Sequence, residues 1–131
     1  MKLSSTLVGV SLLASVMGTQ AQAMLTPIDS PHGFDETVQR LERTIEARGL
    51  MMFAKVDHAA AADKAGLKLR PTQVLIFGNP KSGTPLMQTN PTVALDLPLK
   101  ALVWQGEDGK VRVAVNGAEL YKRHGLNDEQ A

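Results

Sequence analysis

The sequence has 131 residues, of which 44% are hydrophobic and 21% are charged, a composition that fits one ordinary globular domain. Fourteen Lys and Arg residues stand against 13 Asp and Glu residues, and this balance argues against nucleic acid or anionic lipid as a partner. The absence of Cys excludes disulfides, thiolate metal sites and thiol catalysis, so that any metal ligand would be His, Met or a carboxylate.

The N-terminal segment has the pattern of a secretory signal peptide. Lys2 precedes an apolar run over residues 7–16, and small residues follow up to Ala23. An apolar run of about ten residues is too short to cross a bilayer, which requires roughly 20. We therefore expect a signal peptide over residues 1–23, cleavage after Ala23, and a single domain over residues 24–131. The product would be periplasmic or secreted, with no membrane anchor.

The first predicted elements are a short extended segment and a helix. Residues 24–30 suit a strand, because a Ser-Pro-His-Gly turn cluster ends the segment. Residues 34–48 are predicted to form a helix, since apolar side chains recur at helical spacing and Gly49 supplies a left-handed stop. The apolar stripe consists of Phe34, Val38, Leu41 and Ile45.

Two strands and a short helix follow. Residues 50–56 are predicted to form a strand, and residues 59–65 a short helix that Gly66 ends. Residues 72–77 contain Val-Leu-Ile-Phe without alternation, which is typical of a strand covered on both faces. We expect this strand to be central in the sheet.

The segment from residue 78 to residue 98 is rich in Pro, Gly, Thr and Asn. We expect it to be largely irregular, with single helical turns near residues 85–88 and 92–96. An irregular stretch of this length in a small domain is commonly functional, or packs on the sheet as an ordered excursion.

The C-terminal part predicts a hairpin and a terminal helix. Residues 100–105 and 110–116 flank a Gly-Glu-Asp-Gly turn, and alternation in the second strand leaves one of its faces in water. Residues 117–124 suit a helix with Leu120 and Tyr121 on one side. The order β-α-β-α-β-loop-β-β-α predicts a single α+β domain with a mixed or antiparallel sheet and helices on one face.

The loop after residue 77 is the first candidate site. It resembles a phosphate-binding loop, but Thr84 follows Gly83 where that motif requires Lys, so nucleotide binding is not predicted. Its polar side chains could hold a small ligand at the end of a central strand. Alternatively, the glycines only make tight turns, Asn79 caps the backbone and Lys81 is solvated. The candidate ligand contacts are Asn79, Lys81, Thr84 and Asp96, with Met87 and Phe77 as apolar walls and His58 at the end of the second strand.

Two alternatives use His58. With Met51, Met52 or Met87 it could form a copper or zinc site, although Met usually fills cores and Met51 and Met52 point to opposite faces of a strand. With Asp57 and Lys81 it could supply acid-base groups to an enzyme, which would require the three side chains to converge. No cofactor or metal is predicted, and the binding interpretation is preferred.

Two long motifs, residues 77–87 and 94–100, are similar to a known family, and four shorter segments support the similarity: residues 34–37, 49–50, 57–58 and 69–72. On them the chain resembles the domain-of-unknown-function family 302. The resemblance implies a TATA-binding-protein-like fold, with helices on a curved, mostly antiparallel sheet, and frequent self-association, but no established activity. Proteins that share a fold need not share a function, so the resemblance implies no DNA binding. We expect a homodimeric binding module for a small molecule or a protein partner.

Overall fold

The computed structural model describes residues 25–126 and places five antiparallel strands in one sheet, in the order β1-β5-β4-β3-β2. The predicted signal peptide lies outside the described residues. The strands are β1 (Ile28–Asp29), β2 (Met51–Asp57), β3 (Thr72–Gly78), β4 (Leu99–Gln105) and β5 (Val111–Val115). The helices are α2 (Phe34–Ala47), α3 (His58–Lys64), α4 (Pro80–Thr89), the 3-10 helix η1 (Pro91–Leu95) and α5 (Ala118–Arg123).

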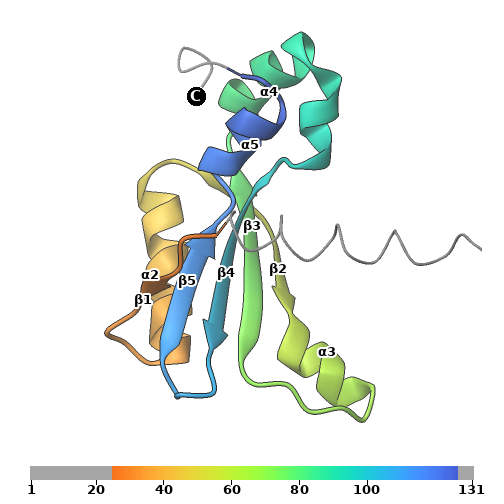
Figure 1. Ribbon diagram of the computed structural model, residues 1–131. Helices are drawn as coiled ribbons and strands as arrows, with labels where there is room; N and C mark the ends of the chain where they lie inside the picture. The colour runs from red at the N-terminus through yellow and green to blue at the C-terminus, as the bar shows by residue number, and fades with distance from the viewer. Residues whose placement is uncertain (1–24, 127–131) are drawn as a thin grey trace, which may run out of the picture.

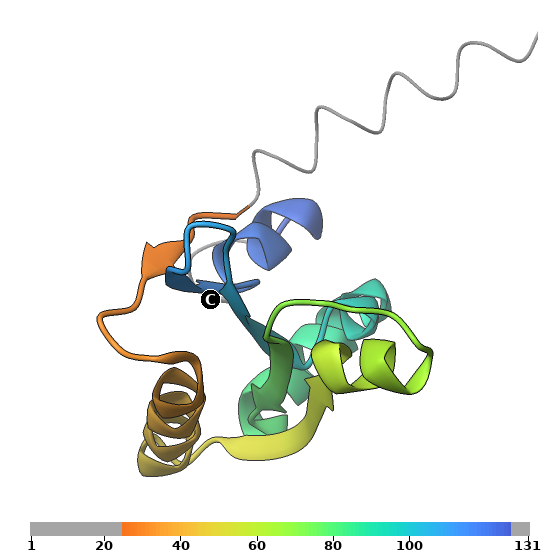
Figure 2. The same cartoon turned by 90° about the horizontal axis from the view of Figure 1, so that it is seen from below.

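The sheet and its helices form an α+β fold, as predicted. Helix α2 packs on one face of the sheet, whereas α3 lies at one end of β2 and β3 (Figures 1 and 2). Helices α4, η1 and α5 lie together beyond the opposite end (Figure 1). Among residues 25–126, no helix combines the length and the apolar character needed to cross a membrane.

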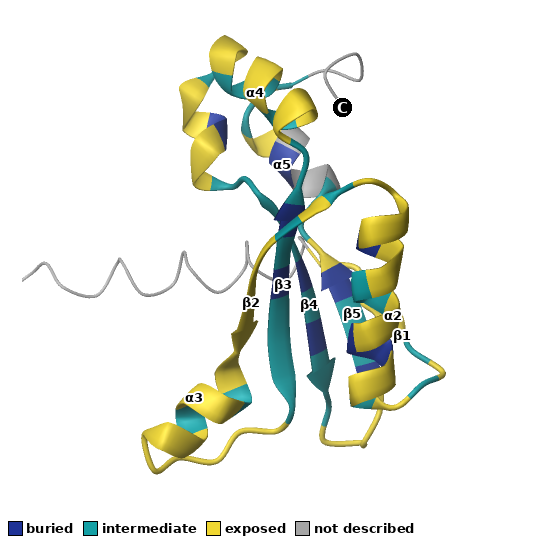
Figure 3. Ribbon diagram, turned by 180° about the vertical axis from the view of Figure 1, so that it is seen from behind, coloured by how far each residue is buried: buried dark blue, intermediate teal, exposed yellow. Residues whose placement is uncertain are grey.

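The core lies between α2 and the strands that it covers (Figure 3). The apolar stripe predicted for α2 faces this layer, with Val38 and Ile45 buried and Phe34 and Leu41 packed at its border. The helix ends before Gly49, which has a φ of 70°, a conformation that glycine adopts without strain. The strands contribute Leu75, Phe77, Ala101, Val103 and Val111.

The segment after β3 is helical, and the prediction of a largely irregular loop over residues 78–98 was wrong. Each of its helices begins with an Asn-Pro pair. Asn79 accepts a hydrogen bond from the backbone N–H of Lys81 at 2.9 Å, and Asn90 accepts one from Thr92 at 3.1 Å. Asn is a strong N-cap residue, and Pro fits the first helical position because its missing N–H needs no partner there. Two of the Pro and two of the Asn residues that suggested a loop therefore serve as helix starts.

The predicted hairpin and terminal helix are present, but the alternation in β5 is only partly kept. Val111 is buried as expected, whereas Val115 is 47% exposed and Ala114 only 4%. The change occurs where the chain leaves β5 and turns into α5 (Figure 1). Leu120 of α5 is buried, and the side chain of Tyr121 lies outside the described part.

Candidate functional site

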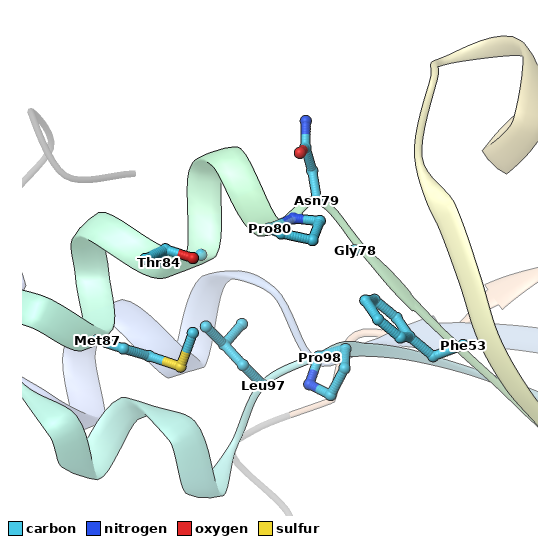
Figure 4. A pocket seen from close by; sticks show the side chains of 9 residues that line it. Phe53, Gly78, Asn79, Pro80, Thr84, Met87, Leu97 and Pro98 are labelled. Atoms are coloured by element: carbon cyan, nitrogen blue, oxygen red, sulfur yellow. The ribbon is translucent and has the colours of Figure 1, made fainter.

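A mainly apolar cavity of about 260 Å³, here called the α4 cavity, opens between the end of β3, helix α4 and the segment that precedes β4 (Figure 4). Side chains from parts of the chain far apart in sequence surround it. They come from β2, from the end of β3 with helix α4, and from the segment after η1. The lining residues are Phe53, Gly78, Asn79, Pro80, Gly83, Thr84, Met87, Leu97 and Pro98.

Local backbone features bring these walls together. The pairing of β2 with β3 shifts between Met52 and Ala54, and this bulge holds Phe53, whose ring edge lies beside Gly78. A bulge re-aims the side chain that it contains. Opposite Phe53, the segment that leads into β4 carries Leu97 and Pro98, joined by a cis peptide bond.

The lining contains no ionisable side chain, and its only polar side chains are Asn79 and Thr84. The amide oxygen of Asn79 already accepts the N–H of Lys81, and its side chain points away from Leu97 and Pro98 (Figure 4). Thr84 and Met87 lie one turn apart on α4, a spacing that places them on the same face of the helix. Chemically, the α4 cavity can hold an apolar group and offers few hydrogen bonds.

Three of the predicted contacts, Asn79, Thr84 and Met87, line the α4 cavity, but Phe77 and Lys81 do not. Phe77 precedes Gly78 in β3 and therefore points to the opposite face, where it is buried in the core below α2. Lys81 is exposed on α4.

Sequence reasoning missed Phe53, and it included Leu97 only as the last residue of the candidate loop, without naming it as a contact. No local signal marks either residue, because the bulge in β2 and the turn before β4 bring them to the site.

Asp96, a predicted ligand contact, is instead engaged in a polar cluster between η1 and α5. Its carboxylate lies 2.7 Å from His124 Nε2 and 2.7 Å from Arg123 Nη1. The hydrogen bond from His124 and, after it, the charge of Arg123 hold the pKa of Asp96 below its usual value of 3.8. Asp96 therefore links the last helix to η1, and it does not line the cavity.

The same cluster places a hydroxyl, an imidazole and a carboxylate in a row, since Thr92 Oγ1 lies 3.1 Å from His124 Nδ1. A catalytic hydroxyl must give its proton to the imidazole. The hydroxyl of Thr92 instead donates to Asn90 Oδ1 at 2.7 Å, inside the cap of η1. The row is better explained as a tie between η1 and α5 than as a catalytic triad.

The structure separates the residues of the two His58 hypotheses. His58 begins α3 at one end of β2, whereas Met51 and Met52 lie at the other end. Six residues of extended strand span roughly 20 Å, so His58 cannot share a metal ion with either Met. Met87 also lies at the far end, in the α4 cavity. In the described part of the chain, no group of three or more His, Asp and Glu side chains could hold a metal ion.

The acid-base hypothesis fails for the same reason. Met51 pairs with Gly78 and Asp57 with Gln73, so Lys81 and Asp57 lie at opposite ends of the β2–β3 pair. Asp57 is also occupied locally, since it accepts hydrogen bonds from the N–H of Ala60 at 2.8 Å and from Gln73 Nε2 at 3.2 Å. Asp57, His58 and Lys81 cannot act on one substrate position.

Comparison with known proteins gives a family and a fold. The model of the domain of unknown function DUF302 matches residues 27–131. Proteins named fluoride-specific ion channel FluC 1, from Brucella suis and Brucella abortus, are each 46% identical over 103 residues. The match covers 78% of this chain and about two fifths of either relative, 41% and 38%. The crystal structure of an uncharacterized conserved protein DUF302 from Bacillus stearothermophilus aligns with a TM-score of 0.72 and 21% identity, over 82% of this chain and 84% of that one.

Proposed function

The chain belongs to the DUF302 family, for which a fold but no activity is known, and we propose from the α4 cavity that it is a binding module for a small ligand. The convergence of three separate segments on one apolar cavity carries this proposal. Ligand sites in proteins are typically concave and apolar, with a few polar groups at defined positions. Here the hydroxyl of Thr84 would provide such a group.

Native mass spectrometry of the protein purified gently from its own cells tests the proposal. We expect added mass that matches a small molecule, and we expect Met87→Trp to lose it because the larger side chain fills the cavity. Gln88→Trp is the matched control, since Gln88 is exposed on the same helix and lies outside the lining. A wild-type protein without cargo, or cargo retained equally by Met87→Trp, would contradict the proposal.

We also propose that the protein is exported, since residues 1–23 have the charged, apolar and small-residue regions of a signal peptide. Cell fractionation followed by intact-mass measurement tests this. A periplasmic or secreted product that begins at Met24 is expected, and a product that retains residues 1–23 in the cytoplasm would refute export.

The partner that we propose is a second copy of the chain. Strand β2 ends the sheet order, so its outer edge is unpaired, and its exposed side chains include Met51 (52%), Phe53 (47%) and Val56 (38%). A long apolar edge strand invites pairing with another chain. Antiparallel pairing of β2 with its copy would satisfy the same backbone groups on both sides of a two-fold axis.

A second candidate function is an accessory role beside a membrane ion channel. Its support is the 46% identity to proteins named fluoride-specific ion channels, of which this chain spans about two fifths. The α4 cavity lacks the positive charge that would favour fluoride, so this role would require contact with the channel protein. Fluoride efflux from vesicles that contain such a channel, measured with and without this protein, tests it. An unchanged rate would exclude this function.

A further inference from the structure

Two glycines in the wall of the α4 cavity, Gly78 and Gly83, are not explained by backbone conformation. The glycines with positive φ in the described residues are Gly49, Gly66, Gly109 and Gly125. Gly78 ends a strand and Gly83 lies within α4, in conformations that any residue adopts. The backbone therefore does not require glycine at either position.

Steric crowding does not explain them either. A Cβ atom at Gly78 would lie 3.6 Å from Phe53 Cε2 and from Pro98 Cβ. A Cβ atom at Gly83 would lie 3.5 Å from Leu97 Cδ1 and 3.9 Å from Met87 Cε. These are ordinary van der Waals distances, and all four contacts are with residues that line the cavity. Because Gly78 and Gly83 carry no side chain, the space that a side chain would fill at each position remains part of the cavity.

Helix stability argues in the same direction. Glycine is the poorest helix former after proline, so Gly83 weakens α4 relative to alanine, and Pro85 is also inside this helix. A residue that neither the backbone nor packing requires, and that weakens its own helix, needs another explanation. Keeping space open beside Leu97 and Met87 supplies one.

We propose that Gly78 and Gly83 keep the α4 cavity open for a compact, uncharged ligand with a hydrocarbon body and one hydrogen-bonding group near Thr84. This inference rests on the binding function proposed above and names the class of ligand. A dry apolar cavity of 150 Å³ takes a benzene molecule, so about 260 Å³ suits one ring with a short substituent. The lining offers no ionised side chain to pair with a charged ligand, and a charge that leaves water without such a partner is strongly disfavoured.

Three probes that share one ring test the charge requirement: benzyl alcohol, benzoate and benzylammonium. Each is titrated into the ¹⁵N-labelled protein while the amide signals of Gly78, Gly83 and Thr84 are followed by NMR. We expect benzyl alcohol to shift these signals and to bind at least tenfold more tightly than either charged probe. Equal or tighter binding of benzoate or benzylammonium would overturn the ligand class, yet leave the cavity as a binding site.

Matched variants test the role of the glycines. Gly83→Leu should weaken the binding of benzyl alcohol at least tenfold, whereas Ser82→Leu should not, because Ser82 is exposed on α4 outside the lining. If Gly83→Leu does not fold, Gly83→Ala should still weaken binding severalfold. Unchanged affinity in both Gly83 variants would refute the role of Gly83. If none of the three probes shifts the cavity signals and the native protein carries no cargo, the proposed function fails as well.

Discussion

Neighbouring residues of β3 serve different layers of the molecule. Phe77 points into the core below α2, and Gly78 faces the α4 cavity on the other side of the sheet. This follows from the alternation of side chains along a strand. At the single-residue scale, the role of a side chain thus depends on which face of the strand it occupies as much as on residue type. Phe77 lies on the core face and therefore does not contribute to the predicted site.

Gly83→Ala gives a prediction at this scale. The added methyl group meets Leu97 and Met87 at ordinary contact distances and removes the helical penalty of glycine. We expect the free energy of unfolding to rise by about 1 kcal/mol, measured by urea denaturation. A lower stability would show that the wall of the cavity cannot accept a methyl group at this position.

Asp96 gives a pH-dependent prediction. Its pKa is lowered in the folded protein, chiefly by the hydrogen bond from His124. The carboxylate therefore stabilises the fold above its unfolded pKa near 4, and this contribution is lost as the pH falls through the lower native pKa. We expect Asp96→Asn to lower the free energy of unfolding at pH 7 by about 1 to 2 kcal/mol.

The difference between the wild type and Asp96→Asn should shrink as the pH falls below 4, measured by denaturant unfolding at several pH values. Glu46→Gln serves as a control on the exposed face of α2. A difference that stays constant down to pH 2.5 would contradict a role for the ionised carboxylate.

At the scale of elements, the segment after β3 shows how caps override composition. The Gly and Pro content of residues 78–98 favours irregular structure, yet two Asn-Pro starts give α4 and η1. The other helices and strands follow the predicted order. Their apolar patterns and stop signals lie within each segment, so each of these elements can be predicted from its own residues.

Substitution of Asn79 tests its role as the cap of α4. Asn79→Ala should lower the free energy of unfolding by about 1 kcal/mol, because the N–H of Lys81 loses its acceptor. Asn79→Ser should remain close to the wild type, since Ser also caps helices. Urea denaturation measures both, and an equal loss in the two variants would show that capping is not the role of this side chain.

At the scale of the whole molecule, the length of β2 decides which residues lie close enough to form one site. The strand separates the His58 end of the sheet from the end that carries the α4 cavity. Its outer edge is unpaired in the sheet order, so the strand that divides the two ends also provides the surface proposed for self-association.

Ala54→Lys tests that surface. Ala54 is exposed in the middle of β2, and a lysine there places like charges near each other across the proposed two-fold axis. We expect the wild type to sediment as a dimer at micromolar concentration and Ala54→Lys as a monomer. Gln39→Lys, on the exposed face of α2, should remain dimeric. A monomeric wild type would contradict the proposal.

The sequence by itself determined the α+β class, the order of the elements outside residues 78–98 and the stripe of α2 that faces the core, because these depend on spacing and on stop residues within each segment. It also indicated Asn79, Thr84 and Met87, since all three belong to one short stretch of the chain, the cap and body of α4. The tertiary structure decided the rest. The bulge in β2 brings Phe53 to the cavity, pairing with α5 takes Asp96 away from it, and the span of β2 keeps His58 from Met51 and Lys81. Each of these depends on contacts between segments distant in sequence, which no local pattern encodes.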